Sequence, residues 1–286
     1  MPELPEVHAL VTDLGSRLDG RTVERFDVVS FAALKTFDPP VAALAGGTVR
    51  RVTRHGKFLD IQVDELHVII HLARAGWVRW RADPPAPSGR PGRTALAARL
   101  VLDDGSGFDI TEAGTKKSLA VYVVRDPDEV PGITRLGPDP LSPEFTLDVF
   151  RGILGRAGRS QIKGVLRNQS LIAGIGNAYS DEILHTARMS PFAPAAMDDE
   201  KVVRLFEAMQ STLAGAIERA DGLAASELKK EKKSAMQVHG RTGEPCPVCG
   251  DIVRQVIYTD STFQYCPTCQ TGGKPLADRV LSRLLK

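Results

Sequence analysis

The sequence predicts an α+β protein with more than one domain, and three observations support that prediction. An amphipathic helical pattern opens the chain, short β-rich runs continue to residue 124, and helical patterns return after a proline-rich stretch. All four cysteines lie together near the C-terminus. A β-rich part followed by a helical part indicates an α+β architecture, and 286 residues suffice for more than one core.

The first predicted element is a helix over residues 3–18. Apolar residues recur there every three or four positions, and Gly20 follows the last of them. The opening Met-Pro-Glu-Leu-Pro-Glu has two interpretations. It can be a capped helix start, with Pro5 in the first turn and acids favoured by the helix dipole. Alternatively, removal of Met1 leaves Pro2 as a secondary amine that can form an iminium adduct, with Glu3 placed to move a proton. Because short motifs often occur by chance, the capped start is favoured when the motif is considered alone.

Eight short β-rich runs follow the helix and predict a sandwich or a barrel. Glycine, proline and aspartate separate them at Gly46-Gly47, Pro84–Gly92 and Asp103–Gly107. The predicted strands are Val23–Val29, Thr48–Thr53, Phe58–Val63, His67–Leu72, Gly76–Trp80, Ala95–Leu102, Phe108–Thr111 and Ala120–Val124.

Five prolines in residues 126–143 predict a semi-stiff linker at a domain boundary. Helical patterns then cover residues 146–154, 161–168, 177–187 and 199–220, and residues 226–234 are expected to form a polar connector. The expected parts are therefore a first domain (1–125), the linker, a helical domain (144–225), a cysteine hairpin (238–272) and a basic tail (273–286).

Composition predicts a cytosolic protein, because no apolar run is long enough for a membrane span and no secretory signal is present. The formal net charge is only +2, but residues 226–286 carry ten basic and six acidic groups. This C-terminal excess of positive charge is where a polyanion is expected to dock.

The cysteines form the strongest motif in the chain. Cys246-Pro-Val-Cys249 and Cys266-Pro-Thr-Cys269 are two knuckles that can enclose one tetrahedral zinc ion, and the run between them has the pattern of a β-hairpin. Four protein ligands leave no open coordination position, so the zinc is expected to be structural. The alternative is four unrelated thiols.

A glycine-rich turn lies between two predicted helices and is a candidate phosphate site. The segment from Gln161 to Glu182 contains Ala-Gly-Ile-Gly directly before Asn177, and backbone amides at such a helix start can bind phosphate. Lys163 and Asn177 can add side-chain donors. Lys57, in Arg54-His-Gly-Lys, follows a glycine that indicates a bulge or turn; alone it is most simply a solvated lysine.

Together the motifs resemble the formamidopyrimidine-DNA glycosylase / endonuclease VIII family of base-excision repair enzymes. The matching segments are Pro2-Glu-Leu-Pro-Glu-Val, Arg54-His-Gly-Lys57, His71-Leu, Ile162-Lys163, Ile172-Ala-Gly-Ile-Gly-Asn177-Ala-Tyr, Val238-His-Gly-Arg-Thr-Gly-Glu-Pro-Cys246 and Tyr265-Cys-Pro-Thr-Cys-Gln270. Several motifs in the family's order are more specific than any one, and they favour the amine interpretation of Pro2.

The resemblance implies an N-terminal helix leading into a β-sandwich, a helix–two-turn–helix domain and a zinc hairpin, with DNA between the domains. It implies that the Pro2 amine attacks C1′ of a flipped, damaged nucleotide and that Glu3 protonates the opening sugar. It also implies that Lys57 contacts phosphate and assists elimination. His71, Arg74, Lys163 and Asn177 are the other expected DNA contacts.

Three departures from the family pattern limit the substrate prediction. Ala73-Arg74-Ala75-Gly76 stands where the 8-oxoguanine type has Gly-Met-Ser-Gly, so Arg74 would have to fill the space left by the flipped base. The run after Asp109 lacks the Arg-Arg-Phe that recognises the opposite cytosine. Ser261 replaces the zinc-hairpin arginine that the family associates with δ-elimination; Arg254 and the tail arginines, Arg279 and Arg283, are candidate substitutes.

The leading functional prediction is therefore a bifunctional DNA glycosylase and abasic-site lyase, acting as a monomer on double-stranded DNA in the bacterial cytoplasm or nucleoid. One alternative is a catalytically silent damaged-DNA binder on the same fold. A more distant one is a nucleic-acid-binding zinc module of the ribosomal or topoisomerase-associated kind. The lysine run Lys229–Lys233 has two interpretations, a solvated charged face and a DNA contact.

Overall fold

The computed structural model describes residues 1–84, 95–113, 116–258 and 261–277. The chain forms two compact units. The first contains Met1–Leu136 with Arg219–Lys229, and the second contains Gly137–Glu218 with Lys230–Lys286. Within the described ranges, every helix is too short or too polar to span a membrane.

The first unit begins with helix α1 (Leu4–Leu18), which confirms the helix predicted from the apolar spacing. Eight strands follow, and each corresponds to a predicted β-rich run: β1 (Val23–Val28), β2 (Val49–His55), β3 (Phe58–Val63), β4 (Leu66–His71), β5 (Gly76–Arg81), β6 (Leu96–Leu102), β7 (Gly107–Glu112) and β8 (Ala120–Val124). Short 3-10 turns interrupt the connections at η1 (Phe31–Ala33), η2 (Val41–Leu44) and η3 (Pro127–Glu129).

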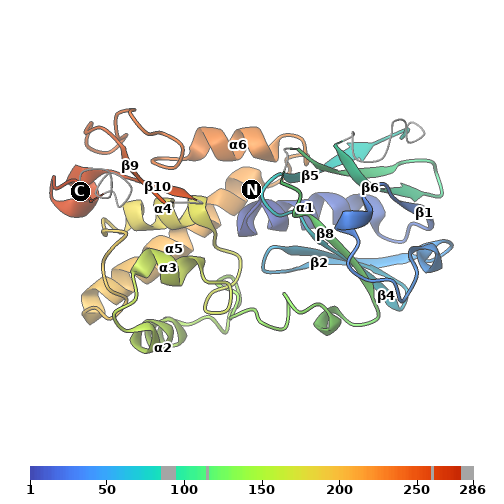
Figure 1. Ribbon diagram of the computed structural model, residues 1–286, viewed down its shortest axis with the longest axis horizontal. Helices are drawn as coiled ribbons and strands as arrows, with labels where there is room; N and C mark the ends of the chain where they lie inside the picture. The colour runs from blue at the N-terminus through green and yellow to red at the C-terminus, as the bar shows by residue number, and fades with distance from the viewer. Residues whose placement is uncertain (85–94, 114–115, 259–260, 278–286) are drawn as a thin grey trace. The chain divides into compact units, whose positions relative to one another are not determined.

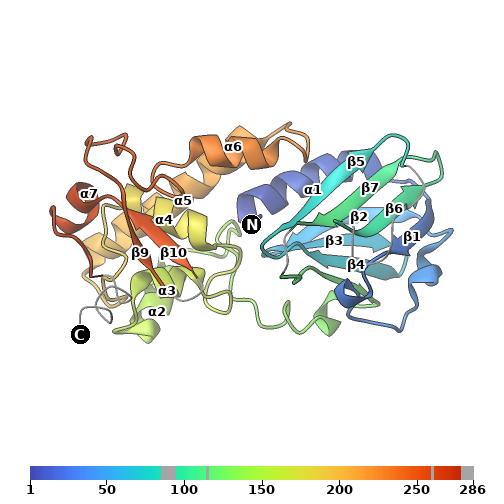
Figure 2. The same ribbon diagram turned by 45° about the horizontal axis from the view of Figure 1, so that its top comes forward.

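The strands form two antiparallel four-stranded sheets, ordered β1-β6-β7-β5 and β2-β3-β4-β8 (Figure 2). Inward side chains from both sheets share one hydrophobic core, which includes Leu100 and Phe108 from the first sheet and Val68 and Ile70 from the second. The two sheets therefore form a sandwich, and the alternative of a single closed barrel is wrong.

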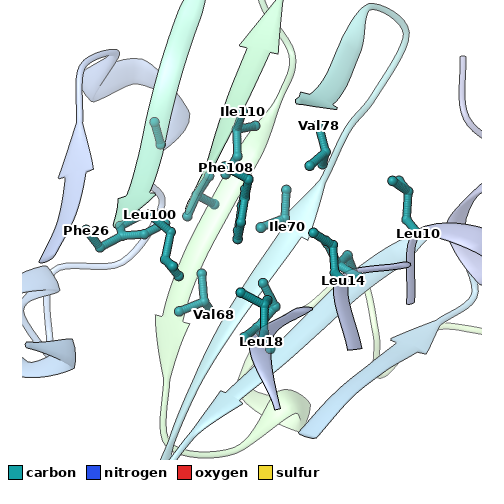
Figure 3. Close-up of a cluster of buried hydrophobic side chains, with 14 of the residues drawn as sticks. Leu10, Leu14, Leu18, Phe26, Val68, Ile70, Val78, Leu100, Phe108 and Ile110 are labelled. Carbon is teal, nitrogen blue, oxygen red and sulfur yellow. The ribbon is translucent and has the colours of Figure 1, made fainter. Parts of the chain in front are cut away.

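Helix α1 contributes its apolar stripe to the same core. Leu10, Leu14 and Leu18 are fully buried and point into the cluster, as Figure 3 shows. The helix packs against β2 and β3. Burying three leucines fixes α1 on the sandwich, with each side chain contributing roughly 1.5–3 kcal/mol. The start of the chain is thereby attached to the sheet that carries Lys57.

The second unit contains the four predicted helices, with slightly different ends. They are α2 (Leu147–Ala157), α3 (Ile162–Arg167), α4 (Asn177–Thr186) and α5 (Asp199–Ala220) (Figure 1). Thr146 caps α2, because its hydroxyl accepts a hydrogen bond from the Val149 amide. One hydrophobic core unites the four helices. The glycine-rich turn separates α3 from α4, as expected for a helix–two-turn–helix.

Residues 226–234 are not the connector that the sequence predicted, because helix α6 (Leu228–Ala235) occupies most of this segment. The prediction was wrong because charge was taken as a sign of irregular chain. Lysine, glutamate, leucine and alanine all have good intrinsic helix propensity. Leu228, which is 1% exposed, anchors the first turn in the core of the first unit.

The last described elements form the predicted cysteine hairpin. Strands β9 (Arg254–Ile257) and β10 (Thr262–Tyr265) pair in antiparallel fashion, and α7 (Pro267–Thr271) follows them. Most of the predicted basic tail, including Arg279 and Arg283, lies outside the described residues.

Candidate functional site

Pro2 and Glu3 stand at the first turn of α1, and both are buried. Glu3 is the N-cap residue of the helix, and its amide donates a 2.8 Å hydrogen bond to the Glu6 carboxylate. Glu3 and Glu6 are each only 2% exposed. Both interpretations of the opening motif are therefore compatible with this geometry. The residues form the capped start of a helix, and Glu3 directly follows Pro2 in the chain.

Lys57 lies in the tight turn between β2 and β3. His55 pairs with Phe58, so Gly56 and Lys57 are the two turn residues. Gly56 has φ +54°, a left-handed conformation that favours glycine. The turn indicated by the sequence is confirmed. Lys57 is 9% exposed, so the simplest interpretation from sequence, a solvated lysine, is wrong.

His71 ends β4 directly opposite Phe58, the residue after Lys57. The rings of His71 and Phe58 have centroids 4.6 Å apart. Burial, together with the positive charge of Lys57, lowers the pKa of His71 to about 4. The turn therefore presents one ammonium group beside one neutral imidazole at pH 7. That pair can bind a phosphate through one charged and one neutral donor.

Arg74 is exposed in the turn between β4 and β5. The Gly76 amide donates to the Leu72 carbonyl at 2.8 Å, and a Cβ at Gly76 would come within 2.2 Å of that same oxygen. Ala73 adopts φ +51° in the same turn. The structure thus places Arg74 in a tight turn and leaves it exposed, and its role as a DNA contact stays a prediction.

Asp109, the first residue of the divergent run, is structural. It lies on β7, is 3% exposed, and accepts hydrogen bonds from Arg99 at 2.6 Å and from Arg81 at 3.0 Å. Burial alone would raise the pKa of Asp109, but the two guanidinium groups hold it below its ordinary value. This carboxylate therefore has a structural role, which is to neutralise two arginines of the sheet.

Lys163 is buried inside the second unit. Its ammonium donates to the Asp181 carboxylate at 2.6 Å, to the Ser180 hydroxyl at 2.7 Å and to the Asn177 carbonyl at 3.2 Å. Asp181 is fully buried and also contacts Nδ1 of His239 at 2.7 Å. The charge of Lys163 is therefore neutralised internally and ties α3 to α4.

Asn177 is the first residue of α4 and connects this helix to the cysteine hairpin. Its Nδ2 donates to the Thr262 carbonyl at 2.7 Å, whereas its Oδ1 is buried without a hydrogen-bond partner among the described residues. An amide nitrogen carries two hydrogens, so one remains for a further acceptor such as phosphate. The structure thus brings Lys163 and Asn177 together, with different roles for their side chains.

Three polar residues of α4 were not identified from sequence, namely Asp181, Glu182 and His185. The Glu182 carboxylate accepts hydrogen bonds from three successive amides at residues 237–239, and burial raises its pKa. Nε2 of His185 lies 3.3 Å from Sγ of Cys246. These residues hold the hairpin against α4. Their only signal in the sequence is a run of charged residues within an apolar helix.

The four cysteines converge as their spacing predicted. Their sulfur atoms all lie within 4.8 Å of one another; Cys246 and Cys269 are 3.9 Å apart, and Cys249 and Cys266 are 3.3 Å apart. A tetrahedral zinc thiolate site has sulfur atoms about 3.8 Å apart, given Zn–S bonds of about 2.3 Å. Burial raises the pKa of Cys269 to about 11 and that of Cys266 still further, so these thiols need a cation in order to ionise. The cluster fits a metal ion.

Comparison with known proteins finds a family model that matches each of the two units. The family model described as the formamidopyrimidine-DNA glycosylase N-terminal domain matches residues 1–115. The model described as the formamidopyrimidine-DNA glycosylase H2TH domain matches residues 136–227. The two matches include every predicted site residue except the cysteines.

Individual relatives agree with the family models. The formamidopyrimidine-DNA glycosylase of Symbiobacterium thermophilum is 34% identical and covers 94% of this chain and 89% of its own length. An uncharacterized formamidopyrimidine-DNA glycosylase-like protein of Mycobacterium tuberculosis is 57% identical over 153 residues, which are 53% of this chain and 94% of that protein. The structure of Lactococcus lactis Fpg in complex with DNA containing an abasic site aligns with a TM-score of 0.80 at 26% identity, covering 94% of this chain and 99% of that one.

Proposed function

Because the chain belongs to the formamidopyrimidine-DNA glycosylase family, we propose that it is a DNA-repair enzyme that removes damaged bases and also cleaves abasic sites. The observation that carries this proposal is the placement of Pro2 and Glu3 at the buried start of α1. The same family model that includes these two residues also includes Lys57 and His71. The substrate is double-stranded DNA.

The proposed reaction begins with the secondary amine of Pro2 once Met1 has been removed. The nitrogen lone pair attacks C1′ of a flipped nucleotide, and the glycosidic bond breaks as the base departs with the bonding electrons. The Pro2 nitrogen gives up its proton, and the departing base takes up one proton, so the charges balance. Glu3 then donates a proton to O4′ as the sugar ring opens, which leaves an iminium ion between Pro2 and C1′. While Met1 is present, the Pro2 nitrogen is a tertiary amide and cannot react in this way.

Strand cleavage follows from the acidity of the iminium ion. Loss of a 2′ proton places electrons in the C1′–C2′ bond, and the 3′ phosphate leaves by β-elimination. Water then hydrolyses the iminium and regenerates the amine of Pro2. Lys57 and the neutral His71 are proposed to bind a phosphate near this centre, and Asn177 to bind another phosphate of the same DNA.

We infer that the cysteine cluster binds one zinc ion and that its role is structural. Four sulfur ligands fill a tetrahedral site, so the ion has no open position for a substrate. The residues that would hold it are Cys246, Cys249, Cys266 and Cys269. When bound, zinc stabilises these sulfur atoms as thiolates.

Borohydride trapping on duplex DNA with an abasic site tests the proposed function. Mass spectrometry first establishes that Met1 is absent, and borohydride then reduces any iminium to a stable protein–DNA adduct. We expect a covalent adduct with the processed protein. Glu3→Gln should lower the trapping rate by roughly 10²–10⁴, the usual contribution of a proton-transferring side chain.

The same chain with Met1 retained is the matched control, because it has every side chain but no free amine at Pro2. Pro2→Gly replaces the secondary amine with a primary one and tests the nature of the nucleophile. If homogeneous Met1-free protein forms no adduct, the enzyme proposal is wrong. Tight binding to the same duplex would then favour a silent damaged-DNA binder.

A further inference from the structure

The turn of the cysteine hairpin borders a cavity of about 350 Å³ within the second unit. Ser261 lines this cavity, together with Arg167 and Lys163 from α3 and with Phe263 and Tyr258 from the hairpin. The family resemblance places a phosphate-binding arginine at the position of Ser261. Because Ser261 carries no charge, a phosphate bound at this cavity would need a cation from another residue.

Of the candidate substitutes from sequence, Arg279 and Arg283 lie outside the described residues, and Arg254 is at the wrong end of the hairpin. Thr262, next to Ser261, pairs with Ile257, whereas Arg254 pairs with Tyr265 at the opposite end. Three residues of strand separate the two ends, or about 10 Å at about 3.4 Å per residue. Arg254 is also absent from the lining of the cavity.

Lys163 lines the cavity, but its charge is already used. Its ammonium lies 2.6 Å from the carboxylate of Asp181, which is fully buried. Rotating Lys163 towards an external anion would leave that carboxylate without its cation, which is costly in a buried site. A phosphate at this cavity needs a cation other than Lys163.

Arg167 meets that need. It is the last residue of α3, and its side chain is exposed. Its carbonyl accepts a hydrogen bond from the Gln169 side-chain amide at 2.8 Å, but its guanidinium group forms no hydrogen bond or ion pair within the described part of the chain. A guanidinium group can grip two phosphate oxygens at once. The Ser261 hydroxyl across the cavity offers one more donor.

A second observation links this cavity to the phosphate contact proposed at Asn177. Thr262, which adjoins Ser261, accepts the Asn177 side-chain amide at 2.7 Å. Asn177 is the residue proposed to donate to DNA phosphate at the start of α4. An anion bound by Arg167 and Ser261 would therefore lie close to one held by Asn177.

We propose that Arg167 is a DNA-phosphate-binding residue that takes over, together with Ser261, the role of the missing hairpin arginine. This rests on the proposed function only in that the anion is a phosphate of duplex DNA. The hairpin turn supplies the hydroxyl and α3 supplies the cation. No covalent step involves Arg167, which acts through binding alone.

The test is binding of the zinc-loaded protein to duplex DNA containing a tetrahydrofuran abasic analogue, measured by fluorescence anisotropy between 50 and about 300 mM salt. Arg167→Ala should weaken binding about tenfold at about 150 mM salt and reduce the slope of log K against log salt by about one. Arg254→Ala removes the same charge from the far end of the hairpin and should change affinity less than about twofold. Ser261→Arg in the Arg167→Ala protein should recover most of the lost affinity.

The proposal is overturned if Arg167→Ala binds like the wild type while circular dichroism and zinc content are unchanged. It is also overturned if Arg254→Ala shows the loss instead. The tetrahydrofuran analogue has no reactive C1′ hydroxyl, so this measurement does not depend on iminium chemistry. Borohydride trapping by the wild type reports separately on the proposed enzyme, and failure of one proposal can be distinguished from failure of the other.

Discussion

His71 shows how one side chain changes its character when the fold places it. In sequence it lies near the end of a β-rich run, and only the family resemblance marks it as an expected DNA contact. Strand pairing sets it against Phe58. Burial, together with the positive charge of Lys57, lowers the pKa of His71 to about 4. At neutral pH the site therefore gains a hydrogen-bonding group without gaining charge. The positive charge beside the imidazole comes from Lys57.

The shifted pKa of His71 makes stability depend on pH in a defined window. Between pH 6.5 and about 4 the unfolded chain binds a proton that the folded chain does not. The stabilisation is therefore complete above pH 6.5 and is lost as the pH falls through about 4. At about 1.4 kcal/mol per pKa unit, the loss is up to about 3 kcal/mol.

His71→Phe tests this window, because phenylalanine keeps a ring against Phe58 but cannot titrate. We expect the free energy of unfolding of the wild type to fall by up to about 3 kcal/mol relative to the variant as the pH goes from 7 to 4. Urea unfolding followed by the fluorescence of Trp77 and Trp80, both in the first unit, provides the measurement. Parallel pH profiles for the two proteins would show that His71 is not the titrating group.

At the scale of elements, sequence periodicity predicted the helices and strands that bury one face in a hydrophobic core. Helix α1 and all eight strands of the sandwich followed from spacing, because each has one face in the core. Helix α6 did not, since its four lysines resemble a solvated run. Only the fold shows that Lys232 lies 4.5 Å from the centre of the Tyr179 ring while its neighbours Lys229 and Lys233 are exposed.

Lys163 marks the limit of motif-based prediction for the site. The motif identified an important lysine, but it could not show which way the side chain points, because Asp181 and His239 are distant in sequence. The structure makes Lys163 a buried brace between α3 and α4. The cysteine cluster, by contrast, was predictable residue by residue because zinc knuckles carry their ligands at fixed local spacing.

Lys163→Met distinguishes a brace from a phosphate contact. Methionine keeps most of the apolar stem but removes the ammonium group that neutralises the buried Asp181 carboxylate. The loss should lower the free energy of unfolding by roughly 3–5 kcal/mol. The hydrogen-exchange rates of the α3 and α4 amides should rise in the absence of DNA, because the contact that joins these helices is weakened. Lys232→Met, which removes a cation from the Tyr179 ring, is the matched control and should cost about 0.5–1 kcal/mol. Unchanged exchange with weakened DNA binding would identify Lys163 as a phosphate contact instead.

At the scale of the whole molecule, the two units depend on different sources of stability. The first has a continuous hydrophobic core shared by two sheets and α1. In the second unit, the hairpin adds only small clusters of its own and is joined to α4 largely through polar contacts. These contacts are Asn177 to Thr262, Asp181 to the Gln264 amide, Glu182 to the amides of residues 237–239, and His185 to Cys246. Such contacts hold only while the hairpin keeps its shape.

Removal of the metal should therefore destabilise the hairpin of the second unit and leave the stability of the first unit unchanged. Without a cation, the thiols of Cys266 and Cys269, whose pKa values are raised, return to their neutral form, and the ligand bonds that close the hairpin are lost. We expect a strong chelator, or Cys246→Ser, to abolish amide protection in residues 237–258 and 261–271. Protection should also fall in the first turns of α4, because Asn177, Asp181 and Glu182 lose their partners on the hairpin. The strands of the sandwich should exchange as before, because their core contains none of these groups. Hydrogen exchange with peptide-level mass spectrometry, repeated after zinc is restored, measures all three regions at once.

Two outcomes would contradict this prediction. Loss of protection in β3, β4 or β7 on chelation would show that the two units do not unfold separately. Full protection of the hairpin without metal would show that its own packing suffices.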